Sequence, residues 1–142
     1  MASGEFLFFL DDDITLRDDA IEKMVDVLQH STFSYAYCDY SRTGGASGIY
    51  KSKPWDFYNL RKQNFISSQS LIRARDFIGW DEKVIRYTDW DLWLRMAREG
   101  KKGVYIPETL FVAYYSPDGV SLRGNNDRKY WFDYVKQKNE IC

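Results

Sequence analysis

Residues 5–13 read Glu5-Phe6-Leu7-Phe8-Phe9-Leu10-Asp11-Asp12-Asp13, a continuous apolar run that ends in three aspartates. Such a run predicts a strand that is buried on both faces, as in a parallel sheet. The carboxylates then lie at the carboxyl end of the strand, where open α/β sheets bind their ligands. Because residues two apart in an extended chain share a side, we expect Asp11 and Asp13 to face one ligand.

Three segments are predicted to be helices. In the first, from Asp18 to Leu28, apolar residues fall at i, i+3, i+4 and i+7, behind acids that favour a helix amino terminus. In the second, from about Asp89 to Glu99, one face is apolar: Trp90, Trp93, Leu94 and Ala97. Gly100 is placed to end this helix. The third, Asp127–Lys138, is rich in aromatic residues and lysines.

Strands are expected between these helices. Phe33–Tyr40 and Phe65–Ile72 have strand composition, and Val104–Tyr114 is expected to give short strands because Pro107 interrupts it. The glycine-rich segment Thr43–Gly48 predicts a loop. With 44% apolar residues the chain is able to build a core, and we expect a single α/β domain over residues 1–142.

The composition excludes several classes of protein. Lys and Arg (20) nearly balance Asp and Glu (21), so no strong field attracts a nucleic-acid backbone or an anionic membrane surface. Apolar stretches are too short to span a bilayer, and the first residues lack the features of a secretory signal. We therefore expect a cytoplasmic chain with no membrane segment and no nucleic-acid partner. The two cysteines, Cys38 and Cys142, are interpreted as reduced thiols.

The three aspartates suit the transfer of a sugar from a nucleoside diphosphate. The leaving diphosphate gains negative charge as the glycosidic bond breaks, and a divalent cation stabilises that charge. Mg²⁺ and Mn²⁺ prefer oxygen ligands and keep water and phosphate oxygens, so one or two carboxylates are enough. The alternative is a polar strand end whose acids cap the next helix. An EF-hand calcium site fits less well, because its turn glycine and later glutamate are absent.

Two acids lie at the start of the second predicted helix, and Asp89 is the first of them. An inverting sugar transferase needs a general base that takes the proton of the acceptor hydroxyl. A carboxylate here is oriented by backbone donors, although the helix dipole lowers its basicity. The alternative is that Thr88 or Asp89 caps the helix. Trp93 is assigned to the core, while Trp90 is either a core residue or a surface on which a sugar stacks.

Taken together, these motifs resemble those of family-two glycosyltransferases with the GT-A fold. Gly4–Ile14 is similar to the family's strand and metal-binding Asp-x-Asp motif, and Ile78–Glu82 to its Gly-Gly-Phe-Asp-Glu turn. Thr88–Arg95 is similar to its Glu-Asp-x-Asp-Leu-x-x-Arg helix, and the likeness extends from about Gly4 to Ser121. The resemblance implies a partial GT-A fold, similar to nucleotide-diphospho-sugar transferases, with a mixed sheet flanked by helices and the amino-terminal nucleotide-binding strands missing.

The resemblance also implies a role for each site residue. Asp13, with Asp11, coordinates Mn²⁺ or Mg²⁺, and Asp12 lies near the donor ribose or phosphate. Asp89 is the catalytic base. The remaining site residues contact the acceptor or order the site: Trp90, Asp91 and Arg95.

Two features depart from the family pattern. Thr88 replaces the usual glutamate, and Tyr114–Pro117 lacks the arginine and histidine often found in the late loop. A third metal ligand therefore has no counterpart in that loop.

The implied substrates are a nucleotide-sugar donor and a carbohydrate or lipid-linked acceptor. Because the nucleobase-binding strands have no counterpart before Gly4, we expect a homo-oligomer or association with a separate amino-terminal half, and weak or no transferase activity of the chain alone. A partner of this kind would bring the chain to the membrane face. The alternative function is a non-catalytic carbohydrate-binding or assembly module that keeps part of the fold.

Overall fold

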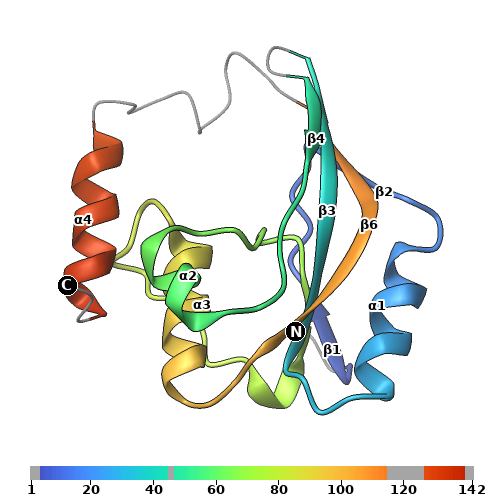
Figure 1. Ribbon diagram of the computed structural model, residues 1–142, viewed down its shortest axis with the longest axis horizontal. Helices are drawn as coiled ribbons and strands as arrows, with labels where there is room; N and C mark the ends of the chain where they lie inside the picture. Colours follow the sequence, from blue (N-terminus) through green and yellow to red (C-terminus); the bar gives the residue numbers. More distant parts are fainter. Residues whose placement is uncertain (1–3, 45–46, 115–126, 140–142) are drawn as a thin grey trace.

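A computed structural model describes residues 4–44, 47–114 and 127–139 of the chain. Within these residues one mixed sheet separates helix α1 from helices α2, α3 and α4 (Figure 1). The helices are α1 (Ala20–Gln29), α2 (Phe57–Lys62), α3 (Thr88–Arg98) and α4 (Arg128–Lys138), with a 3-10 turn at Ala74–Asp76. The mixed α/β architecture predicted from the sequence is confirmed.

The six described strands are β1 (Phe6–Phe8), β2 (Ile14–Leu16), β3 (Tyr35–Thr43), β4 (Gly48–Tyr50), β5 (Leu71–Arg73) and β6 (Gly103–Tyr114). They are arranged in the order β1-β5-β3-β6-β2, and β4 pairs with the later half of β3. Strands β3 and β6 are parallel, while every other pair is antiparallel. The helical crossover from β3 to β6 carries the segment on which the candidate site is built.

Strand β3 supplies side chains to both apolar cores. Tyr35 and Tyr37 point to the α3 side, while Ala36 and Cys38 point to the α1 side, as the twofold alternation of a strand requires. Tyr35 stacks on Trp93 of α3 with the ring centroids 4.3 Å apart. Cys38 is a free, buried cysteine, and burial raises the pKa of its thiol to about 12. Cys142 lies outside the described residues.

The predicted helices are confirmed. Of the four apolar residues whose spacing predicted α1, Met24 and Leu28 are fully buried and Val25 is half-buried, whereas Ile21 is 38% exposed. Helix α3 is followed by Gly100 in a left-handed conformation (φ 78°), and the amide of the next residue returns to the Met96 carbonyl oxygen at 2.9 Å. This arrangement satisfies the last carbonyl groups of the helix.

The prediction for the first strand is wrong in two respects. Strand β1 ends at Phe8, and it pairs antiparallel with β5 at one end of the sheet order, so its residues are only half-buried. Phe9 leaves the strand and packs against Phe77 and Trp80, each with a centroid distance of 5.1 Å. Leu10 is then 55% exposed. The apolar run therefore contributes to both cores, with Phe6 and Phe8 on the α1 side of the sheet and Phe9 on the α3 side.

Two other strands differ from their predictions. Strand β6 is continuous, because Pro107 lies at a register shift where Cys38 pairs with Ile106 and Asp39 pairs with Thr109. A bulge tolerates proline, because the unpaired residue of a bulge donates no backbone hydrogen bond to the neighbouring strand, and proline has no N–H to donate. Phe65–Ile72 contributes only its last two residues to β5, because side-chain hydrogen bonds replace ladder bonds before them. The predicted Thr43–Gly48 loop is the β3–β4 connection, of which residues 45–46 lie outside the described part.

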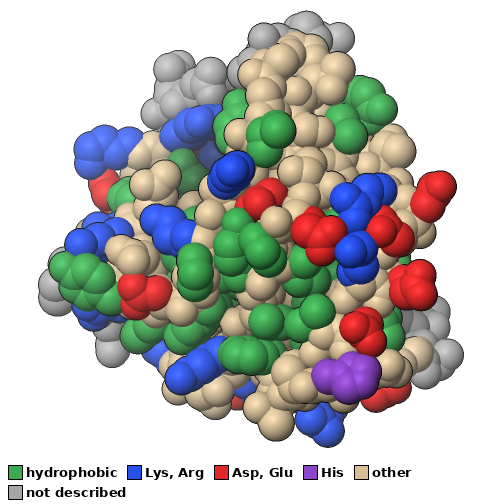
Figure 2. Space-filling view, turned by 45° about the vertical axis from the view of Figure 1, so that its right-hand side comes forward, with side chains coloured by type: hydrophobic (Ala, Val, Ile, Leu, Met, Phe, Trp, Pro, Cys, Tyr) green, Lys and Arg blue, Asp and Glu red, His purple; other side chains and the backbone are tan. Residues whose placement is uncertain are grey.

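Charges on the α1 side of the molecule are mixed. Figure 2 shows acidic and basic side chains next to one another on this face, and its ion pairs include Arg17–Asp19, Arg17–Glu108 and Lys23–Glu108. Among the described helices, none has the length and apolar character needed to cross a membrane.

Candidate active site

The three aspartates lie in an exposed turn between β1 and β2. The amide of Ile14 donates to the carbonyl oxygen of Asp11 at 3.3 Å, so the backbone bends instead of staying extended. The prediction that strand alternation places Asp11 and Asp13 on one side is therefore wrong in its physical basis. What brings their carboxylates together is the turn, and the negative charges of Asp13 and Asp12 both act on Asp11.

Asp11 is fixed by Gln69, a residue 2% exposed that precedes β5. The Gln69 Nε2 donates to Asp11 Oδ2 at 2.8 Å, and the Gln69 Oε1 accepts from the Asp11 amide at 3.3 Å. Partial burial, followed by the charges of Asp13 and Asp12, raises the pKa of Asp11, while the Gln69 amide opposes that shift. The position of this carboxylate is thus set by a buried amide on a different part of the chain.

Asp89 lies in the first turn of α3 and does not cap the helix. The N-cap residue of α3 is Tyr87, so the alternative in which Thr88 or Asp89 caps this helix is wrong. The Asp89 Oδ1 accepts from the Trp90 amide at 2.8 Å, and the Oδ2 accepts from Asn64 Nδ2 at 3.2 Å. Burial raises the pKa of Asp89 to about 6, and the charge of Asp11 adds to the rise.

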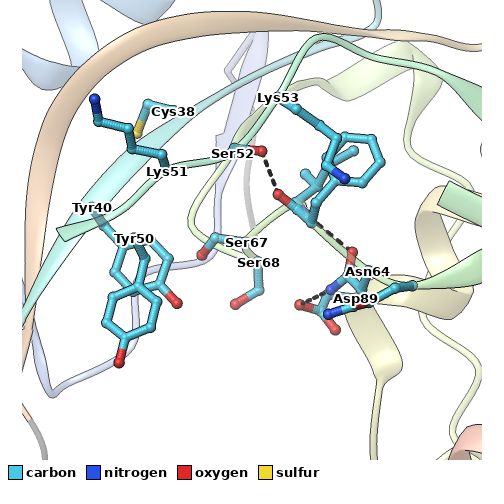
Figure 3. A pocket seen from close by; sticks show the side chains of 13 residues that line it. Cys38, Tyr40, Tyr50, Lys51, Ser52, Lys53, Asn64, Ser67, Ser68 and Asp89 are labelled. Carbon is cyan, nitrogen blue, oxygen red and sulfur yellow. Dashed lines mark hydrogen bonds between the residues drawn. The ribbon is translucent and has the colours of Figure 1, made fainter. Parts of the chain in front are cut away.

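Asp89 and Asp11 open onto two neighbouring hollows. The first, about 430 Å³, is lined by Asp89 together with Tyr40, Tyr50, Ser67 and Ser68 among others. In the view of Figure 3, the two serines lie between the tyrosine pair and Asp89. The second hollow, about 390 Å³, is lined by Asp11 and Thr88, and it shares Ser68 with the first. The two predicted acidic motifs, far apart in the sequence, are therefore brought to adjoining parts of one surface.

Asp91 faces away from these hollows and is fully buried. Its carboxylate accepts from Arg95 Nε at 2.9 Å, from Lys138 Nζ at 2.6 Å and from Asn139 Nδ2 at 2.9 Å. Arg95 also donates to the carbonyl oxygen of Gly79 at 2.8 Å. These contacts tie α3 to the preceding turn and to α4, which fits the ordering role expected of Asp91 and Arg95.

Trp90 belongs to the core. Its side chain is fully buried, its Nε1 donates to the Leu60 carbonyl oxygen at 2.7 Å, and its ring stacks on Phe132 at 5.0 Å. No face of the indole is left for a sugar, so among its two predicted roles only the ordering of the site fits this position.

Several residues at the site were not predicted from the sequence. Ser67, Ser68 and Gln69 lie within the predicted strand Phe65–Ile72, and Asn64 directly precedes it. The available signal was the run of polar residues in Ser67–Ser70, which is unusual for a strand buried on both faces. Tyr40 and Tyr50 belong to different strands, and their rings stack at 5.3 Å only once β4 folds back on β3.

Comparison with protein families decides the class of the chain. The model for glycosyl transferase family 2 matches residues 1–88. The chain belongs to glycosyltransferase family 2. A search of curated proteins finds no match.

The family-two match contains the aspartate turn, Asn64 and Gln69, and it ends one residue before Asp89. The mixed sheet between helices fits a partial GT-A-like fold. The described residues contain no group of three or more His, Cys, Asp or Glu side chains that is arranged to hold a metal. Residues 115–117 of the late segment Tyr114–Pro117 lie outside the described part.

Proposed function

We propose that this family-two glycosyltransferase chain supports metal-assisted transfer of a sugar from a nucleoside-diphosphate sugar to an acceptor hydroxyl, with inversion at the anomeric carbon. The observation that carries the proposal is the convergence of Asp11 and Asp89, which line adjoining hollows joined at Ser68. Their mutual charge effect supports the same arrangement, since Asp11 contributes to the raised pKa of Asp89.

The aspartate turn fits a hard divalent cation. Three carboxylates crowd one exposed turn, and the repulsion that Asp11 receives from Asp12 and Asp13 is relieved by a bound cation. Asp11 and Asp13 would hold Mn²⁺ or Mg²⁺ through oxygen, with water and donor phosphates as further ligands. When bound, the ion neutralises charge on the leaving diphosphate. Asp12 is left to face the donor ribose or phosphate.

Asp89 has the properties of a general base. With a pKa of about 6 it is ionised at neutral pH and remains more basic than an ordinary aspartate. As the acceptor oxygen attacks the anomeric carbon, its proton passes to Asp89, and the bond to the leaving diphosphate breaks on the opposite face. The donors to its carboxylate in the described part of the chain, the Trp90 backbone amide and the Asn64 side-chain amide, are neutral, so they leave its negative charge in place to accept this proton.

The Asp89 hollow fits a carbohydrate acceptor. The stacked rings of Tyr40 and Tyr50 supply an apolar wall, and the hydroxyls of Ser67 and Ser68 supply hydrogen-bonding groups (Figure 3). Sugars need both kinds of contact, since their ring faces are apolar and their edges are polar. A free or lipid-linked sugar is the acceptor class that we propose.

Isothermal titration calorimetry tests the metal and donor part of this function. Wild-type chain is titrated with Mn²⁺ and a nucleoside diphosphate, with UDP, GDP and ADP used in turn. Asp13→Ala is expected to abolish or strongly weaken binding, while Asp18→Ala, an exposed acid just outside the turn, is expected to bind as wild type. Sugar binding without any metal requirement would instead support the non-catalytic carbohydrate-binding module.

A further inference from the structure

One short segment contacts both carboxylates of the site. Residues 64–69 connect α2 to β5, and the amide groups at the two ends of this stretch donate in different directions. Asn64 Nδ2 donates to Asp89 at 3.2 Å, and Gln69 Nε2 donates to Asp11 at 2.8 Å. Ser68, which lies between them in sequence, lines both hollows.

The segment is itself held in place along its length. The Asn64 Oδ1 accepts from the Ile66 amide at 3.1 Å, and the Ile66 carbonyl oxygen accepts from Trp93 Nε1 at 3.1 Å. Ser52 Oγ donates to the carbonyl oxygen of Phe65, a contact drawn in Figure 3. A stretch fixed by α3 on one side and by the β4–α2 connection on the other is able to set the separation of two groups that it holds.

The hydrogen-bond donors to Asp11 and Asp89 differ in charge from those to Asp91, the buried acid of α3. Asp91 is neutralised by Arg95 and Lys138. Asp11 and Asp89 receive neutral amides instead, which fix the direction of a carboxylate without cancelling its charge. Amide donors therefore suit carboxylates that must still bind a cation or accept a proton.

We propose that Asn64 and Gln69 are positioning residues, which hold Asp89 and Asp11 in the orientation that sugar transfer requires. The inference rests on the proposed function for its chemical purpose, while the contacts themselves do not. Each residue acts on a different carboxylate, so the two substitutions should have separable effects.

Several charged or titratable groups surround Asp89, and each enters the design of the test. Asp11 faces it from the turn after β1, and Tyr40 of β3 is close enough for the two to affect each other electrostatically. Lys51 and Lys53 line the same hollow from the segment after β4. Because Asn64→Ala changes none of these groups, a change in the pKa of Asp89 reports the loss of its amide donor.

The first experiment is an NMR titration of the Asp89 carboxyl group in metal-free protein. Asn64→Ala is expected to raise the pKa of Asp89, because the amide favours the ionised form. The matched control is Asn59→Ala, which removes an amide donated to Asp56 at 2.6 Å outside the site, and it should leave Asp89 unchanged. An unchanged Asp89 titration in Asn64→Ala would overturn the role of Asn64.

The second experiment measures binding of Mn²⁺ and UDP, GDP or ADP by calorimetry. Gln69→Leu is expected to weaken binding about tenfold or more, whereas the control Asn59→Ala should bind as wild type. Gln69→Glu is a second variant of the same shape, whose carboxylate keeps an acceptor for the Asp11 amide. It replaces the donor to Asp11 by a like charge, which should turn the Asp11 carboxylate away and weaken binding too. Wild-type affinity in a folded Gln69 variant would overturn its role. If wild type binds none of the three nucleotides with Mn²⁺, the proposed function itself fails.

Discussion

Two aspartates in the first turn of one helix have opposite environments. Asp89 and Asp91 are two residues apart on α3, so the helix turns them to different sides. Asp91 enters the core, where two cations compensate it, while Asp89 lines an open hollow and receives neutral donors, the Trp90 backbone amide and the Asn64 side-chain amide. The surroundings, more than the residue type, decide which acid is available for chemistry.

The raised pKa of Asp89 predicts a stability cost at neutral pH. The folded chain binds this proton up to about pH 6, while the unfolded chain releases it near pH 4, so stability falls as pH rises between these values. Asp89→Asn removes the charge, and it is expected to stabilise the protein by about 1–2 kcal/mol at pH 8. At pH 4 the same substitution should have little effect. Urea unfolding at both pH values measures this, and destabilisation at pH 8 would contradict it.

The sequence pointed to the candidate acids Asp11 and Asp89, but not to the side chains that hydrogen-bond to them. Asp11 and Asp89 belong to motifs whose order and spacing are specific, and the structure brings them to one surface. Asn64 and Gln69 have no comparable chemical signature, because a neutral amide becomes informative only when its hydrogen-bond partner is known. Trp90 was ambiguous for the same reason, since helical spacing does not show what covers a face.

Helices were more predictable than strands, for a physical reason. The apolar spacing of α1 and α3 extends over about three turns, so it is read from local sequence alone. Strands β1 and β5 have three residues each, and their ends depend on distant partners. Strand β6 continues past Pro107 because the register of β3 shifts there, which no pattern within β6 indicates.

The pairing of β6 with β3 constrains Gly103, which lies opposite Tyr35. A Cβ atom at this position would lie 2.3 Å from a ring carbon of Tyr35. That ring is held by its stack on Trp93 and by a hydrogen bond from Trp55 at 2.9 Å, so it is not free to move away. Gly103→Ala is expected to destabilise the protein by about 1–3 kcal/mol. In thermal unfolding, Gly4→Ala serves as the control, because its nearest contact is 3.6 Å; equal stability of the two variants would refute the argument.

At the scale of the whole molecule, two apolar cores share strand β3, and the last described helix joins only one of them. The α1 core and the α3 core meet β3 from opposite faces (Figure 1). Helix α4 covers the α3 side, where Phe132 packs on Trp90 and Val135 is buried. Its end is tied by Lys138 and Asn139 to the carboxylate of Asp91. One buried carboxylate therefore connects the end of the described chain to the helix that bears the proposed base.

Removing the charge of Asp91 should lower the free energy of local opening of α4 more than that of the sheet. Asp91→Asn keeps the shape of the side chain but removes the anion of Arg95 and leaves Lys138 with Asp81, at 3.2 Å, as its remaining acidic partner among the described residues. Because both cations still reach solvent, we expect a loss of about 2–4 kcal/mol. The control is Asp133→Asn, which breaks a pair with Lys129 on the exposed face of α4 and should change stability little.

Native-state hydrogen exchange distinguishes local from global effects. Amides of α4 should exchange faster in Asp91→Asn while those of β3 keep the most protection, because β3 pairs with three strands and belongs to both cores. Equal acceleration in α4 and β3 would show that Asp91 stabilises the fold as a whole and does not act as the anchor of its last helix.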